Sequence, residues 1–196
     1  MKLNQTTRFV LTALFFALIL LFGLTPVGLI PLGFVNVTIL CVPVIVGTIL
    51  LGLKTGLVLG ACFGAVSSLS AFGIWGTPSM LASTLVAASP LLALIMCFLP
   101  RLMVPTVAHF VYVLFSNGKR VSAKAVPYAA ICGSLTNTIL YLGLMLLFYV
   151  MMGIESEKVL KLISGTGLVA GTLEAIVAAV LSTPILTALW KVSRRK

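Results

Sequence analysis

Charged and amide side chains inside long apolar stretches are the residues of this sequence best suited to chemistry. Glu174 lies in the apolar run 165–184, and it is one of only three acidic residues among 196, none of them aspartate. An ionised side chain at bilayer depth costs about 2.5 kcal/mol or more and normally faces the interior of a helical bundle. Glu174 is therefore a candidate site residue.

Four further residues are candidates for the same site. Asn137 and Tyr141 are four residues apart, so they share one face of a helix. Arg101 and Glu174 carry opposite charges, and each lies about 16 residues, or about 24 Å of helix, from the expected cytoplasmic end. They either pair to stabilise the bundle, or one or both face a substrate. Trp75, near the end of an expected helix, either closes the site from outside or anchors the helix at the membrane interface.

Catalytic chemistry is excluded by the absence of the groups that it needs. The single histidine, His109, has no aspartate to orient it, and no G-x-S-x-G motif occurs, so a nucleophilic site is not expected. The segment 47–55 resembles a phosphate-binding loop, but it has one residue too many before Lys54 and follows a membrane helix rather than a strand. Nor has His109 partners at metal-ligand spacing. We expect no enzyme activity, no cofactor and no metal.

The composition places these candidates in a membrane. Apolar residues make up 61% of the chain and charged residues 8%, and the mean hydropathy is +1.25. A soluble domain of this length could not bury so much apolar surface. The net charge of +10 comes from bases clustered at segment ends, so no nucleic-acid partner is expected. The fold class is all-α, a six-helix bundle forming one membrane domain over 1–196. The expected helices cover about 9–24, 35–52, 55–73, 91–116, 126–152 and 165–190.

The fourth helix is the least certain, because four prolines interrupt residues 78–118. Basic residues favour the cytoplasmic side, and both chain ends are basic, so the number of spans should be even. One span here gives six in total and puts ten bases inside, with only Lys158 and Lys161 outside. We therefore expect a helix at 91–116, an outer loop including 78–90 and cytoplasmic termini. The alternative is a helix at 81–99, with Arg101 at the membrane edge.

Small residues indicate where helices pack closely. Glycines recur every four residues at positions 52, 56, 60 and 64, a spacing that lets helix backbones approach one another. We interpret them as packing residues rather than as a site. Ala13 and Ala17 form a similar small-residue step in the first helix, and such a step is by itself weak evidence.

Several stretches resemble the substrate-binding subunits (S-components) of energy-coupling factor (ECF) vitamin transporters. The similar segments are ALFFA at 13–17, PVIVGTILLGLKTGLVLGACFG at 43–64, LPRL at 99–102, GSLTNT at 133–138 and EAIVAA at 174–179. They occur in the family's order along nearly the whole chain. The resemblance implies a six-helix bundle that binds a water-soluble vitamin near its extracellular face. It also implies a transmembrane coupling subunit and two ATPase subunits as partners, with transport by toppling of the bundle.

The resemblance extends to residue roles. Ala13 and Ala17 match the family's contact with the coupling subunit. Among members, the pantothenate-specific subunits are the most similar, around AFGIWG at 71–76 and in the last three helices. Arg101 would then meet the carboxylate, and Asn137 and Tyr141 other polar atoms. Subunits for folate, riboflavin or cobalamin remain alternatives, as does a secondary transporter that works alone. The implied location is the cell membrane of a Gram-positive bacterium.

Overall fold

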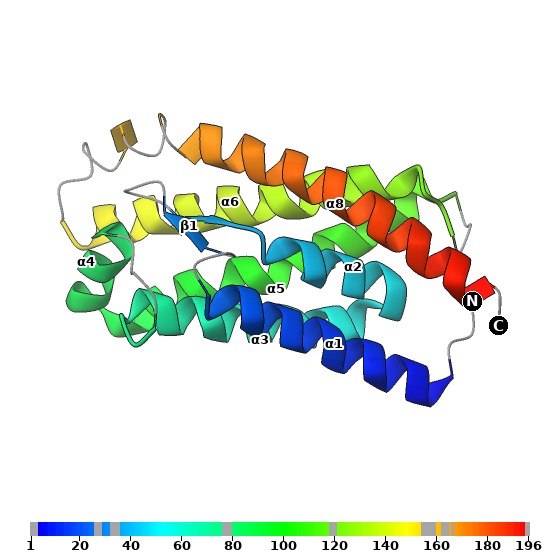
Figure 1. The fold of residues 1–196 in the computed structure, drawn as a ribbon. Helices are drawn as coiled ribbons and strands as arrows, with labels where there is room; N and C mark the ends of the chain where they lie inside the picture. Colours follow the sequence, from blue (N-terminus) through cyan, green and yellow to red (C-terminus); the bar gives the residue numbers. More distant parts are fainter. Residues whose placement is uncertain are drawn as a thin grey trace.

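The computed structural model describes residues 4–25, 29–31, 36–75, 80–117, 121–153, 160–161, 165 and 167–194. Within these residues the chain forms seven helices and one short hairpin (Figure 1). The helices are α1 Gln5–Gly23, α2 Cys41–Leu51, α3 Leu53–Ala71, α4 Met80–Ala88, α5 Pro90–Phe115, α6 Ala125–Met151 and α8 Leu168–Arg194. The hairpin pairs β1 Leu29–Pro31 antiparallel with β2 Asn36–Thr38, with Ile30 opposite Val37.

Five of these helices, α1, α3, α5, α6 and α8, are long and apolar enough to cross a membrane. In lipid each backbone polar group must find its partner within the segment, which a helix achieves. The protein is therefore a multi-pass membrane protein. The start of α1 and the end of α8 lie at one end of the bundle, and α4 and the hairpin lie at the other, called here the distal end (Figure 1).

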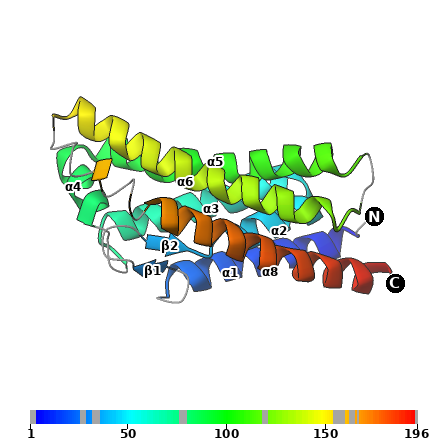
Figure 2. The same ribbon diagram turned by 90° about the horizontal axis from the view of Figure 1, so that it is seen from above.

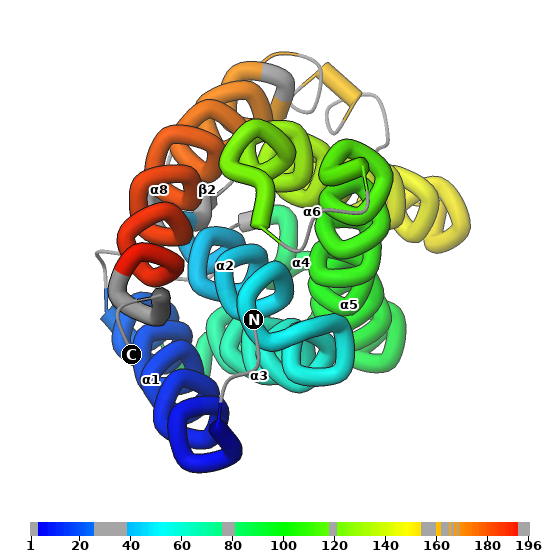
Figure 3. The backbone as a smooth tube through the Cα atoms, turned by 90° about the vertical axis from the view of Figure 1, so that its right-hand side faces the viewer, coloured from blue at the N-terminus to red at the C-terminus, as the bar shows by residue number. Residues whose placement is uncertain are grey.

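The short helix α2 lies inside the bundle. It is apolar on all sides, as expected of a helix without a solvent or lipid face, and nine of its eleven residues are buried. Viewed along the bundle, α1, α3, α5, α6 and α8 surround it (Figure 3). Seen from above, β2 lies beside the start of α8 (Figure 2). The hairpin thus leads into α2 from the distal end.

The expectation of a second helix over 35–52 is wrong at its start. The helix begins at Cys41, and residues 36–38 are a strand instead. Pro43 explains the difference, because proline is tolerated in the first turn of a helix but breaks the interior. A helix from residue 35 would place Pro43 in its interior, whereas a start at Cys41 places it in the first turn. At 11 residues, α2 is also shorter than a membrane span.

The region 78–118 contains a short helix and a long one. The segment assigned to an outer loop contains α4, so the described residues form seven helices rather than the six expected. α5 spans Pro90–Phe115, close to the expected 91–116, with Pro100 and Pro105 inside it. The alternative helix at 81–99 is interrupted at Ser89, which has extended backbone angles (φ −156°, ψ 102°). A residue before proline avoids helical angles, and Pro90 is well placed at a helix start.

The glycines of α3 set its distance from the neighbouring helices. Gly52 forms the turn between α2 and α3 with φ +98°, a conformation that side chains disfavour. A Cβ on Gly60 would lie 2.6 Å from the carbonyl oxygen of Arg101, and one on Gly64 would lie 2.9 Å from the Phe98 ring. A Cβ on Gly56 would collide with Thr48. These glycines are packing residues, and Gly60 lets α3 touch the backbone at Arg101.

Candidate functional site

A polar stripe on α6 forms the centre of the candidate site. Ser134, Asn137, Thr138 and Tyr141 follow the spacing i, i+3, i+4 and i+7, so they lie on one face of the helix. Ser134 and Asn137 are buried, at 0% and 3% exposure. Polar side chains without solvent must find partners in the protein or in a ligand. This stripe therefore faces the bundle interior, where such a partner is needed.

Arg101 of α5 lies against this stripe. Its side chain is 7% exposed, and its guanidinium carbon is 4.4 Å from the centre of the Tyr141 ring. The Phe63 ring of α3 lies 5.3 Å from the same carbon. Aromatic faces attract cations, and more strongly when both are desolvated. The Nη1 atom donates a 3.3 Å hydrogen bond to the carbonyl oxygen of Met96, so the two rings and this bond hold the cation in place.

Glu174 of α8 reaches the same stripe one turn away. Its side chain is 6% exposed, and its Oε2 atom lies 3.0 Å from the Thr138 hydroxyl. A Cβ on Gly171 would lie 2.7 Å from Thr138, so the absence of a side chain there allows α8 to approach. Arg101 and Glu174 thus have different immediate neighbours on α6, Tyr141 and Thr138, which are three residues apart.

Helix register places these groups at one depth. A Cβ on Gly133 of α6 would lie 3.4 Å from both Ile45 of α2 and the Val104 carbonyl oxygen of α5. One turn farther toward the distal end, the same three helices carry Asn137, Cys41 and Arg101. Glu174 of α8 reaches the same level through its contact with Thr138, the residue that follows Asn137 on α6. The four helices α2, α5, α6 and α8 therefore bring their polar groups to a common level.

This level, called here the polar layer, separates two apolar cores. Its members are Arg101, Ser134, Asn137, Thr138, Tyr141 and Glu174. Toward the termini, a core from α1, α2, α3, α5, α6 and α8 includes Val104 and Ala130, and on the side of α1, α2 and α3 the same core continues past the layer to Leu40 and Val66. Toward the distal end, a second core from α3, α4, α5 and α6 includes Cys97 and Leu142. The polar layer is thus enclosed by apolar material on both sides.

Three buried atoms of the polar layer have no hydrogen-bond partner within the described part of the chain. They are Nε of Arg101, Oδ1 of Asn137 and Oγ of Ser134. Leaving a buried donor or acceptor unsatisfied costs about 1–3 kcal/mol. The set contains a cationic donor, an amide acceptor and a hydroxyl, which does both. A molecule with an anionic acceptor and a nearby N–H or O–H donor would satisfy all three.

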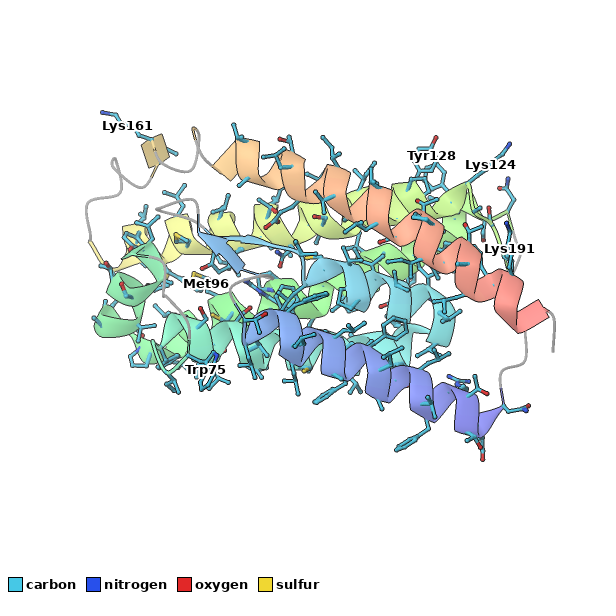
Figure 4. The ribbon with its side chains drawn as sticks, in the orientation of Figure 1. Trp75, Met96, Lys124, Tyr128, Lys161 and Lys191 are labelled. Atoms are coloured by element: carbon cyan, nitrogen blue, oxygen red, sulfur yellow. The ribbon has the colours of Figure 1, made fainter. Side chains whose placement is uncertain are left out.

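The structure does not bring Trp75 to this layer. Gly60 marks the level of Arg101 on α3, the helix continues for about three more turns to Ala71, and Trp75 lies four residues beyond its end. Its side chain is 54% exposed, and its Nε1 donates a 2.7 Å hydrogen bond to the Leu24 carbonyl oxygen. Figure 4 shows it toward the distal end. Trp75 connects the end of α3 to the end of α1.

Ala13 and Ala17 are both exposed on α1. The buried residues of α1 are Phe15, Ile19 and Gly23, on the opposite side of the helix. From Phe9 onward the exposed side is apolar, and it consists of Phe9, Val10, Ala13, Leu14, Phe16, Ala17 and Leu21. We call it the α1 face. It offers a continuous surface for lipid or for a partner helix.

Four residues around the site were not among the sequence-based candidates. Ser134 and Thr138 could have been found, because they flank Asn137 at helical spacing. Cys41 and Phe63 carried no such signal, since a thiol and a ring in apolar helices are indistinguishable from packing residues. Their placement depends on the register of α2 and α3 against the other helices.

Comparison with known proteins identifies the family of the chain. Residues 7–186 match the family model described as "ECF transporter, substrate-specific component". The chain is 32% identical, over 166 residues, to a protein called "Pantothenic acid transporter PanT" from Lactococcus lactis subsp. cremoris (strain MG1363). That alignment covers 80% of this chain and 79% of the relative. The chain belongs to the family of substrate-specific components of ECF transporters.

Proposed function

We propose that the protein is the substrate-binding subunit of an ATP-driven vitamin importer of the ECF type, and that its vitamin is pantothenate. The observation that carries the choice of vitamin is the polar layer with its unsatisfied cation, amide oxygen and hydroxyl. The similarity to a pantothenic acid transporter supports the same choice. The polar layer is the binding site in this proposal.

Pantothenate has the groups that these atoms require. Its carboxylate is an anionic acceptor for the guanidinium of Arg101, which binds carboxylates through planar N–H donors. Its amide N–H and hydroxyl groups are donors for Oδ1 of Asn137, and the Ser134 hydroxyl can take either role. The apolar walls of the two cores suit the methyl groups of the ligand. The match lies in the type of each group as well as in the overall polarity.

We further propose six membrane crossings with both termini in the cytoplasm. Basic residues mark the cytoplasmic side, and Lys124 and Lys191 lie at the end where the chain starts and finishes (Figure 4). In this topology β2 and α2 together make the second crossing. Trp75 and Lys161 then lie toward the outside. The ligand enters from that side. We expect segments 25–34 and 73–90 to cover the site there, although residues 26–28, 32–34 and 76–79 lie outside the described part of the chain.

The energy for import comes from partner subunits in this proposal. The α1 face, centred on Ala13 and Ala17, contacts the transmembrane coupling subunit, because small residues let helices approach closely. Two ATPase subunits complete the complex and hydrolyse ATP. The whole chain, 1–196, acts as one membrane domain in the cell membrane of a Gram-positive bacterium.

Titration calorimetry on the purified protein tests the ligand. We expect pantothenate to bind with one site per chain, and folate, riboflavin and cobalamin to give no heat of binding. If one of these three vitamins bound more tightly than pantothenate, that vitamin would be the substrate instead. Import by the chain alone in vesicles, without ATPase subunits, would instead show a secondary transporter. Arg101→Gln is a direct check of the site, because it keeps much of the side-chain volume and removes the cation.

A further inference from the structure

The buried charge of the polar layer adds up to zero before any ligand binds. Among the described residues that are buried, Arg101 is the only base and Glu174 the only acid. The other bases whose side chains the structure describes are all exposed, and they are Arg8, Lys54, Lys124, Lys161 and Lys191. The site therefore holds one positive and one negative charge between two apolar cores.

An anionic ligand upsets this balance. With the carboxylate of pantothenate in the polar layer, there would be two negative charges and one positive charge in an interior that solvates ions poorly. An uncompensated buried charge is strongly unfavourable, and proteins avoid it by pairing the group or neutralising it. A second ion must enter with the ligand, and the smallest candidate is a proton.

The contact between Thr138 and Glu174 can accommodate that proton. The Thr138 hydroxyl lies 3.0 Å from Oε2 of Glu174 and 3.4 Å from the carbonyl oxygen of Ser134. When Glu174 is ionised, the hydroxyl donates to the carboxylate. When Glu174 is protonated, it donates to the Thr138 oxygen, and the Thr138 proton turns to the Ser134 carbonyl. Both states are hydrogen-bonded with the same heavy-atom positions.

We propose that the site binds its anionic ligand together with one proton, which Glu174 holds. This inference rests on the proposed function. In the free protein, ionised Glu174 balances the charge of Arg101. In the complex, the ligand carboxylate balances Arg101, and Glu174 becomes a neutral carboxylic acid with a proton from the solvent. Ligand and proton together add no net charge to the membrane interior.

None of the other groups around Glu174 can accept this proton at neutral pH, so Glu174 is its acceptor. α8 packs against α6, α2 and β2. Cys41 on α2 and Tyr141 on α6 are neutral at pH 7 in their ordinary forms, so neither takes up a proton. Arg101 on α5 is already protonated. The residues of β2, Asn36–Thr38, include no ionisable side chain.

Calorimetry in buffers of different ionisation enthalpy measures how many protons the protein takes up when the ligand binds. We expect about one proton to be taken up per pantothenate bound at neutral pH. A proton is a co-ligand, so affinity should fall as the pH is raised. Each unit of increase in pH should raise Kd by up to about tenfold, wherever Glu174 is ionised in the free protein and protonated in the complex. Binding of pantothenate with no proton uptake between about pH 6 and 8 would overturn the inference. The same holds if sodium ions strengthen binding, because sodium would then be the compensating cation in place of the proton. No binding of pantothenate at all would overturn the proposed function as well.

Two comparisons assign the proton to Glu174. Glu174→Gln, which resembles the protonated acid, should bind pantothenate without proton uptake and without pH dependence. Glu155→Gln makes the same change in the connection between α6 and α8 and should keep the proton uptake. Panthenol, the neutral alcohol analogue, should bind the unmodified protein without a proton, a test that does not require any variant to fold. Proton uptake that persists with panthenol or in Glu174→Gln would overturn the assignment.

Discussion

Arg101 lies with its guanidinium carbon 4.4 Å from the centre of the Tyr141 ring, a contact between α5 and α6 inside the membrane domain. The ring holds a cation whose Nε has no hydrogen-bond partner in the described part of the chain. An aromatic face attracts a cation without using its N–H donors. Tyr141 can therefore fix the position of Arg101 and leave Nε available for a ligand.

Replacing the Tyr141 ring should weaken both the bundle and the site. We expect Tyr141→Leu to lower the free energy of unfolding by about 0.5–2 kcal/mol, the range of a cation–π contact. Tyr141→Phe keeps the ring and is the matched control, with a smaller loss. Thermal unfolding of the purified protein and titration with pantothenate measure the two effects. Equal losses in the Leu and Phe variants would show that the hydroxyl, not the ring, matters.

Asn137→Ala should affect ligand binding more than folding. The Oδ1 atom has no partner in the described protein, so its removal breaks no protein hydrogen bond but removes one to the ligand, worth about 1–3 kcal/mol. Ser182→Ala is a suitable control, because Ser182 is also buried and unsatisfied but lies eight residues beyond Glu174 on α8. It should leave affinity unchanged. If both variants lose affinity equally, the polar layer is not the site.

Gly60→Ala should disturb Arg101 through its backbone. The added Cβ would lie 2.6 Å from the Arg101 carbonyl oxygen, so α3 and α5 must separate, at a cost of about 1–3 kcal/mol. Gly143→Ala is the control, because no atom lies within 4 Å of a Cβ there. It should leave stability equal or raise it by up to about 1 kcal/mol. A Gly60→Ala variant as stable as Gly143→Ala would contradict the close packing.

Ala13→Leu combined with Ala17→Leu should separate assembly from ligand binding. Both residues lie on the exposed α1 face, opposite the buried side, so larger side chains there prevent a partner helix from approaching. We expect copurification with the coupling subunit to fall while pantothenate affinity is unchanged. Loss of pantothenate affinity with intact assembly would show that the α1 face is not the contact with the coupling subunit.

The proposed topology can be checked by labelling single cysteines in intact cells. Lys161→Cys and Lys124→Cys are a matched pair, because both side chains are exposed and they lie toward opposite ends of the bundle (Figure 4). In a background without the four native cysteines, an impermeant thiol reagent should label position 161 only. Labelling at position 124 instead of position 161 would show that the protein has the opposite orientation in the membrane.

Much of the fold follows from hydropathy, and the two exceptions follow from a proline and from the short length of one helix. Leu and Val runs of membrane length determine α1, α3, α5, α6 and α8, whose observed ends lie within about four residues of those expected. The start of α2 was missed because the effect of Pro43 was outweighed by an apolar run. α4 was missed because a nine-residue helix is too short to be distinguished from a loop by hydropathy.

The site was predictable as far as depth and helix face allow. Arg101 and Glu174 were expected at similar depth, and the structure brings both to the same stripe of α6 as Asn137 and Tyr141. Trp75 was included because it ends a helix, and helix ends can cover a site, but the register of α3 puts it far from Arg101. Lateral neighbours such as Phe63 depend on helix rotation, which apolar sequences do not specify.

If the polar layer is the binding site, the apolar cores on either side of it link substrate choice to the cohesion of the bundle. The unsatisfied atoms that would select a ligand also weaken the layer that joins the cores in the free protein. An apolar substitution there would strengthen the free protein and destroy binding, a trade-off common at functional sites. A change of vitamin specificity at this layer would therefore alter stability as well, and the cores would have to compensate.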